Sequence, residues 1–186
     1  MTLTKRLELI IKFMLNPKEE WKTVETLPYD LRNLVILFLL PMAALIAIAC
    51  FIGGVLWSEM FFGAIFKGIG VGASFAAAVI GTAFILDRII HSFEVDEDNG
   101  KVIRLVIFSY APVFFLGSLA FIIPQLNFIF YPLCLYGIYL FWLGAKYMLR
   151  ISEEKLIGFV FISIIINAAV IAISMVVING FFGLFY

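Results

Sequence analysis

Long uncharged stretches alternate with short charged segments along most of the chain. Uncharged runs cover residues 33–58, 68–86, 105–145 and 156–186. About 20 apolar residues in a helix cross the hydrocarbon core of a bilayer. Each run is therefore about long enough to span a membrane, and the pattern predicts an all-α integral membrane protein.

The run over residues 105–145 is too long for one crossing. It is interrupted by the polar, turn-forming segment IPQLN, which contains Pro124, Gln125 and Asn127. We therefore divide it into two helices joined by a tight hairpin. The sequence then predicts five transmembrane helices within a bundle of residues 33–186, at about residues 33–58, 68–88, 105–124, 128–149 and 156–178.

Residues 1–32 predict two short cytoplasmic helices before the bundle. In residues 1–15, apolar side chains share one helical face and charged side chains share the other, so we expect an amphipathic helix. Such a helix lies on the anionic inner leaflet or packs on the protein's own cytoplasmic face. Asn16 and Pro17 suit the cap and the first position of a second helix. Its Trp21 is expected to anchor at the level of the lipid head groups.

The composition and the distribution of charge agree with a membrane protein. Hydrophobic residues make up 64% of the 186 positions and charged residues 14%, and the formal net charge is zero. Of the 13 Lys and Arg residues, Lys67 alone falls on one side of the predicted five-span arrangement. Because basic residues favour the cytoplasmic side, the N-terminus is expected in the cytoplasm and the C-terminus outside.

The sequence offers little for catalysis or for metal binding. Cys50 and Cys134 lie within apolar runs and are expected to be buried, and His91 has no further ligands nearby for zinc. The acidic residues within 94–98 lack the spacing of a calcium loop and are interpreted as a solvated loop. We therefore expect no enzymatic activity, no cofactor and no metal site.

Five polar residues are candidates for a polar cavity or for helix packing: Asp87, Arg88, Ser109, Tyr110 and Asn167. Asn167 stands near the middle of the last span, where it needs a hydrogen-bond partner on another helix. Asp87 and Arg88 stand at the cytoplasmic end of the second span, where Arg88 can reach the membrane surface. Packing is the favoured interpretation, and a transport site is the alternative.

The second span carries three stripes of small residues, which let neighbouring helices approach closely. The stripes consist of Gly68, Gly72 and Ala76; of Gly70, Ser74 and Ala78; and of Ala73, Ala77 and Gly81. This helix is therefore expected at the centre of the bundle, with a dimer interface as the alternative.

Three segments together carry a family resemblance. The first is a helix start of the form Pro-x-x-x-Trp at residues 17–21. The second is NGKVIRLVIFSYAPVFFLGSLAFIIP. Here a loop with a glycine and basic residues comes first, and an aromatic residue, a small residue and a proline follow in the third span. The third is YPLCLYGIYLFWLGAKYML followed by the charged loop RISEEK. In this order they resemble the prokaryotic branch of the Yip (Ypt/Rab-interacting protein) domain family, although the loop FEVDEDNG is acidic where many relatives are Gly-rich and basic.

The resemblance implies a non-catalytic scaffold of membrane-organising or trafficking type in the cell membrane (inner membrane) of a prokaryote. Eukaryotic relatives work in vesicle traffic and bind small GTPases. The expected partners are membrane lipids, an unidentified protein and further copies of the chain, with no nucleic acid. The alternative is a small-solute transporter or a lipid-moving, scramblase-like protein, which requires Asp87, Arg88 and Asn167 to converge on one cavity.

Overall fold

The structure, a computed structural model, describes residues 16–26, 30–57, 60–95 and 100–182. Within these residues every regular element is helical, and five helical stretches are long and apolar enough to cross a membrane. The predicted all-α, five-span architecture is thereby confirmed. The amphipathic helix expected in residues 1–15 lies outside the described residues.

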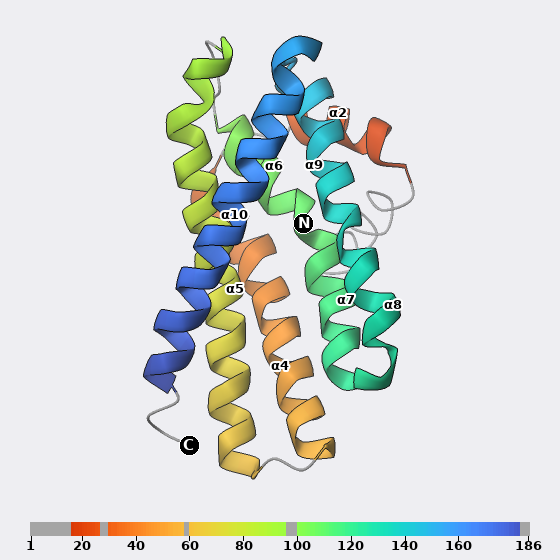
Figure 1. The fold of residues 1–186 in the computed structure, drawn as a ribbon, viewed down its shortest axis with the longest axis vertical. Helices are drawn as coiled ribbons and strands as arrows, with labels where there is room; N and C mark the ends of the chain where they lie inside the picture. The colour runs from red at the N-terminus through yellow and green to blue at the C-terminus, as the bar shows by residue number, and fades with distance from the viewer. Residues whose placement is uncertain (1–15, 27–29, 58–59, 96–99, 183–186) are drawn as a thin grey trace.

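Most of the spans are assembled from more than one helical segment (Figure 1). The first contains α3 (Leu31–Leu34), the π-helical turn η1 (Val35–Leu39) and α4 (Leu40–Leu56). The second contains α5 (Phe61–Ile89) and the 3-10 turn η2 (Ile90–Phe93). The third contains α6 (Lys101–Ser109) and α7 (Ala111–Ile122). The fourth contains η3 (Pro124–Leu126), α8 (Asn127–Cys134) and α9 (Tyr136–Tyr147), and the fifth is α10 (Glu153–Phe182).

Prolines stand at three of the irregular points in the spans. Proline has no N–H group and cannot continue the hydrogen-bond ladder of a helix. Pro41 stands in the first turn of α4, directly after the π-helical turn, and Pro112 stands in the first turn of α7. Pro132 lies inside α8, which ends shortly afterwards at Cys134. At these three points the irregularity therefore follows from the sequence.

Two helix ends differ from the sequence prediction. α5 begins at Phe61 rather than near residue 68, because the helix accommodates Lys67, whose long side chain can carry its charge toward the membrane surface. α10 continues through Asn179 and Gly180 to Phe182 rather than ending near residue 178. One glycine costs a helix only about 1 kcal/mol, which does not end a helix whose backbone must stay hydrogen-bonded in lipid.

α5 lies at the centre of the bundle, between α4 and α10 (Figure 1). A Cβ atom on Gly72 would lie 2.8 Å from the carbonyl oxygen of Ala43, so the backbones of α4 and α5 are in contact at this point. On another side of α5, a Cβ atom on Gly81 would lie 3.0 Å from Cγ1 of Val170 in α10. Residues from two of the small-residue stripes therefore serve packing within a single chain.

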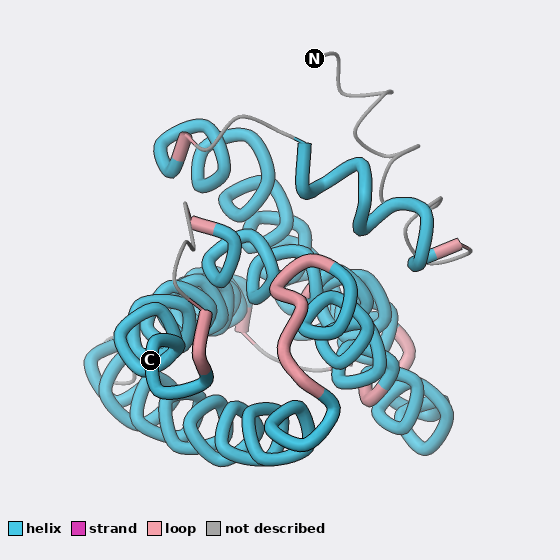
Figure 2. Tube along the Cα trace, turned by 90° about the horizontal axis from the view of Figure 1, so that it is seen from above, coloured by secondary structure: helices cyan, strands magenta, loops and turns pink. Residues whose placement is uncertain are grey.

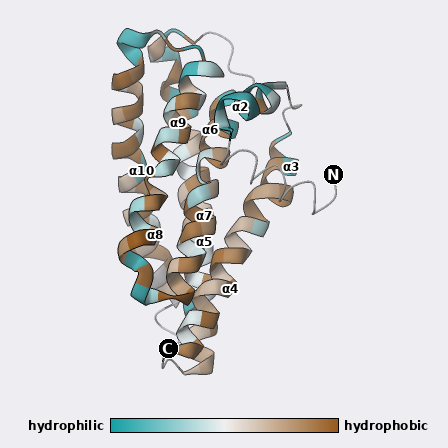
Figure 3. Cartoon of the chain, turned by 90° about the vertical axis from the view of Figure 1, so that its right-hand side faces the viewer, coloured by the Kyte–Doolittle hydropathy of each residue, from teal (hydrophilic) through white to brown (hydrophobic). Residues whose placement is uncertain are grey.

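Polar and apolar surfaces are separated along the bundle axis. α2 (Pro17–Thr26) and the end of the bundle beside it are hydrophilic, whereas the shafts of the spans are mostly hydrophobic (Figure 3). Viewed from above, α2 lies crosswise to the spans (Figure 2). Large apolar side chains such as Ile48, Phe84 and Phe161 are exposed on the shafts. This surface suits the hydrocarbon of a bilayer, which demands no hydrogen bonds from it.

Candidate functional site

The third span breaks at Tyr110, between α6 and α7. Tyr110 has φ −81° and ψ −7°, and Pro112 follows in the first turn of α7. Because Pro112 lacks an N–H group, it cannot donate to the carbonyl group one turn earlier. α9 approaches the break closely, since a Cβ atom on Gly137 would lie 2.8 Å from the Ser109 carbonyl oxygen. The side chains of Ser109 and Tyr110 are both buried at this point.

Four polar side chains from three parts of the fold meet beside this break. Thr82 comes from α5, Ser109 and Tyr110 from the break itself, and Asn167 from α10. The side-chain amide of Asn167 donates a hydrogen bond to the Tyr110 hydroxyl. Thr82 lies near the same hydroxyl, but within the described residues neither Thr82 Oγ1 nor Ser109 Oγ has a hydrogen-bond partner of normal geometry.

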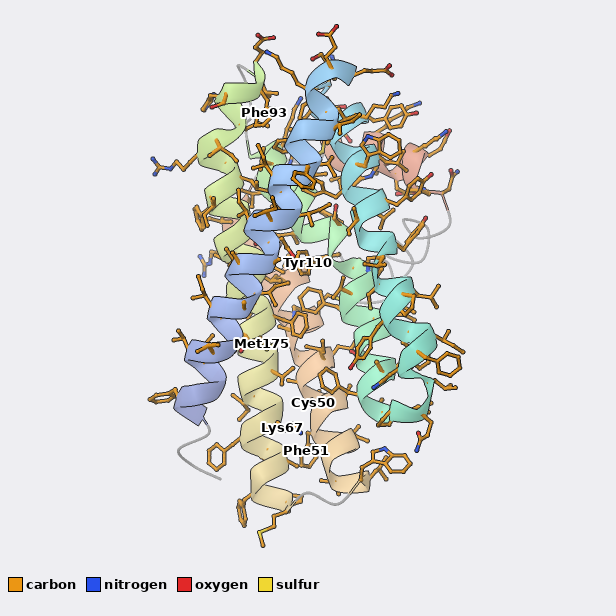
Figure 4. The ribbon with its side chains drawn as sticks, in the orientation of Figure 1. Cys50, Phe51, Lys67, Phe93, Tyr110 and Met175 are labelled. Carbon is orange, nitrogen blue, oxygen red and sulfur yellow. The ribbon has the colours of Figure 1, made fainter. Side chains whose placement is uncertain are left out.

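These side chains line a cavity of about 140 Å³ near the middle of the bundle (Figure 4). Most of the remaining lining is apolar and comes from α5, α6, α7, α9 and α10; it includes Leu86, Val106, Val113, Ile138, Phe141 and Ile171. Figure 4 shows Tyr110 beside α10, near the middle of the bundle's length. We refer to this space as the Tyr110 cavity.

The structure brings together some of the candidate polar residues and separates others. Ser109, Tyr110 and Asn167 all line the Tyr110 cavity. Asp87 and Arg88 do not line it; Asp87 is half-buried and Arg88 is exposed, close to the end of α5. The convergence of Asp87, Arg88 and Asn167 that a charged transport path requires is therefore absent from this cavity.

Thr82 was absent from the set of cavity candidates drawn from the sequence. Its side chain is 2% exposed, and it lines the cavity together with Leu86 one turn later. A polar residue one turn before a buried Leu, on a small-residue helix, is the signal that points to it. That signal gives the face of α5 but not the helix that this face meets.

The helix encoded by residues 17–26 is docked on the bundle rather than on lipid. The side chain of Trp21 is 0% exposed, and its Nε1 donates a hydrogen bond to the carbonyl oxygen of Leu140 in α9 at 3.1 Å. Gly144 leaves room for the indole, because a Cβ atom there would lie 2.7 Å from Cζ2 of Trp21. The indole is thus anchored in a slot on α9, whereas its depth relative to the lipid head groups stays a prediction.

The C-terminal end of α2 is held by a buried arginine. Arg104 in α6 is 3% exposed, and its Nη1 donates to the carbonyl oxygens of Val24 at 2.9 Å and Glu25 at 3.2 Å. The last carbonyl groups of a helix lack partners within the helix and carry partial negative charge. A guanidinium group therefore satisfies and neutralises this end of α2.

Glu25 links α2 to two of the connections between spans. Its Oε1 atom lies 3.1 Å from Nζ of Lys101, at the start of the third span, and 3.4 Å from Nη2 of Arg150, after the fourth. The carboxylate is 22% exposed, so these ion pairs are partly shielded from solvent. We call Trp21, Arg104, Glu25, Lys101 and Arg150 the α2 clasp. In the sequence these basic residues indicate only the orientation of the spans, and no local pattern predicts their contact with α2.

The other residues considered for chemistry are placed as follows. Cys50 is buried as expected, whereas Cys134 is partly exposed on α8, which has no buried residue, and it also borders the Tyr110 cavity. His91 is exposed at the end of the second span. Glu94 forms an ion pair with Lys155, and the rest of the acidic loop lies outside the described residues.

Comparison with known proteins agrees with the sequence patterns. The family model of the Yip1 domain matches residues 11–182, which is most of the chain, and confirms the resemblance found in the sequence. No curated protein and no solved structure gives a significant match.

Proposed function

This chain belongs to the Yip1 domain family, and on that basis we propose that it is a non-catalytic scaffold in the cell membrane of a prokaryote. It acts by presenting α2 at the cytoplasmic surface and by contacts with membrane lipids, with a protein partner or with further copies of the chain. No nucleic acid takes part. The observation that carries this proposal is the α2 clasp, which joins a polar helix to the bundle through a buried indole and a buried guanidinium group.

The clasp supports a scaffold because it fixes one face of α2 and, among the described residues, leaves the opposite face exposed. Trp21 and Val24 are buried against the bundle, while Lys18, Glu19 and Lys22 are exposed. A helix held in this way presents the same set of charged side chains to the cytoplasm at all times. The exposed face is charged, so a polar surface of a partner protein or lipid head groups fit it better than an apolar surface does.

The interior of the bundle also favours a scaffold over a transporter. The Tyr110 cavity encloses only about 140 Å³, and neither Asp87 nor Arg88 lines it. α5 is in backbone contact with α4 through Gly72, so these two helices leave no passage between them at this point. A lipid-moving or solute-moving protein needs a continuous polar path, and these features argue against one here.

The clasp and the positive-inside rule together support an orientation in the membrane. Lys101, Arg104 and Arg150 gather around α2, whereas Lys67 lies toward the other end of the bundle (Figure 4). Basic residues favour the cytoplasmic side, so α2 faces the cytoplasm and the C-terminus lies outside. Fusion of alkaline phosphatase or green fluorescent protein to either end tests this, since each reporter is active on one side only.

Reconstitution into liposomes tests the scaffold against the transport alternative. We expect the purified protein to leave the rates of lipid scrambling and of solute release at the level of protein-free liposomes. The scaffold proposal would be rejected if the protein raised either rate above that of protein-free liposomes and if Asp87→Asn or Asn167→Ala abolished the increase. A known scramblase reconstituted in parallel shows that the assay responds.

In-cell photo-crosslinking tests whether α2 is the contact surface. A photoreactive residue in place of the exposed Lys22 is expected to give adducts of defined mass, and one in place of Met60, 87% exposed at the other end of the bundle, is not. Adducts from Lys22 should be lost when Trp21→Ala releases α2. Adducts that persist in Trp21→Ala, or an absence of adducts from Lys22, would contradict a role for the docked helix.

A further inference from the structure

We propose that the Tyr110 cavity is a binding site for a neutral, ring-sized compound that dissolves in the membrane and carries a hydrogen-bonding oxygen, of the phenol or quinone class. This inference does not depend on the scaffold function, because binding in the cavity requires neither transport nor contact through α2.

Two buried hydroxyl groups give the first argument. Thr82 is 2% and Ser109 is 4% exposed, and among the described residues neither side-chain oxygen has a hydrogen-bond partner of normal geometry, although Thr82 lies near the Tyr110 hydroxyl. Both residues line the cavity. Polar groups inside a membrane have no bulk water to satisfy them, so unpartnered hydroxyls at this depth are costly unless a bound molecule completes them. A hydroxyl group both donates and accepts, which matches a carbonyl or phenolic oxygen on a ligand.

The size and the charge of the cavity define the rest of the ligand. Its volume of about 140 Å³ is close to that of an engineered apolar cavity of about 150 Å³ that admits benzene. Apart from the few polar groups, the lining is aliphatic and aromatic, with Val106, Phe141 and Ile171 among its members. None of the described residues that line it is charged, so a neutral ring fits and an ion does not.

The route of entry leads from the lipid. Ile138 in α9 and Ile164 in α10 both line the cavity, and each is 39% exposed on the outer surface of the bundle. The cavity therefore reaches the lipid-facing surface between these two helices. In Figure 1, α10 and the fourth span diverge along this side of the molecule. A ligand that enters here must first dissolve in the hydrocarbon, as small phenols and quinones do.

Fluorine NMR on the full-length protein in lipid nanodiscs tests the proposal, with 4-fluorophenol as the probe and fluorobenzene as a ring of similar size without the oxygen. We expect saturable binding of 4-fluorophenol above its partition into empty nanodiscs, and at least about fivefold weaker binding of fluorobenzene. Each of Thr82→Val and Ser109→Ala is expected to weaken binding of 4-fluorophenol by about fivefold, because each removes one hydrogen-bonding group.

Ser118→Ala is the matched control. Ser118 is buried in the same span but lies outside the cavity, and its hydroxyl donates to the carbonyl oxygen of Phe114 at 2.6 Å. This variant should bind the probe as the natural chain does. Equal binding of the two probes, or binding that survives Thr82→Val with Ser109→Ala, would overturn the proposal. Absence of saturable binding would also overturn it and would leave ordered water as the partner of the two hydroxyls.

Discussion

Replacing Trp21 with alanine should release α2 from the bundle. The indole has no solvent exposure, fits beside Gly144 and donates a hydrogen bond to Leu140. Truncation of a buried tryptophan to alanine costs about 3–5 kcal/mol, because it removes apolar contact and leaves a cavity. Trp21→Phe keeps much of the contact and removes the hydrogen bond, which is worth about 1 kcal/mol. The two variants therefore separate packing from hydrogen bonding.

Limited trypsin digestion measures the effect. Lys18 and Lys22 lie in α2, and cleavage after either residue requires α2 to leave the bundle and unfold locally. When this opening is fast and reversible, the cleavage rate follows the equilibrium population of the open state. A loss of about 3–5 kcal/mol in docking free energy corresponds to roughly 100- to 4,000-fold faster cleavage in Trp21→Ala.

Trp57 provides the matched control. Its Nε1 also donates to a carbonyl oxygen at 3.1 Å, that of Ile122, but its side chain is 50% exposed and lies away from α2. Trp57→Ala should leave cleavage after Lys18 and Lys22 unchanged. Equal cleavage rates in Trp21→Ala and in the natural chain would refute the conclusion that the buried indole holds α2.

Three further substitutions, the last with Gly158→Ala as its matched control, test other contacts. Arg104→Met should weaken docking of α2 by about 3 kcal/mol, because it removes hydrogen bonds from a charged group to the end of the helix, and the same digestion measures it. Glu25→Gln should weaken docking by no more than about 1 kcal/mol, with an effect that shrinks at high salt; an effect independent of salt would contradict the ion pairs. Gly72→Ala should lower the free energy of unfolding by about 1–3 kcal/mol, since the new Cβ atom would meet the Ala43 carbonyl oxygen at 2.8 Å. Gly158→Ala, where nothing lies within 4 Å of the new atom, should be neutral or stabilising, and equal losses in both glycine variants would contradict the close approach.

The number of spans could be predicted because lipid imposes a simple rule on the sequence. Each crossing needs an uncharged stretch of about 20 residues, and the break at Pro124 divides the one run that is too long. The start of α2 at Pro17 could also be predicted, because capping is a local property of a few neighbouring residues. Both predictions depend on residues that are close together in the sequence.

Neither the docking site of Trp21 nor the Tyr110 cavity could be predicted in the same way. Trp21 and Leu140 are 119 residues apart, and no local pattern connects them. Thr82 and Asn167 lie on helices that are apolar around most of their circumference. Because lipid and protein interior are both apolar, the hydrophobic pattern does not show which face of such a helix points inward. Whether polar groups from three helices come together therefore depends on how each helix is rotated about its own axis, which the sequence does not determine.

The α2 clasp also constrains the order in which the chain is assembled. Trp21 emerges from the ribosome early, but its acceptor Leu140 and the Arg150 that pairs with Glu25 are synthesised only when most of the protein has been made. α2 must therefore wait, with its indole uncovered, while four membrane segments are inserted. Its docking marks the completion of the fourth segment, and a chain truncated before that point would leave a tryptophan-bearing helix without a place to bind.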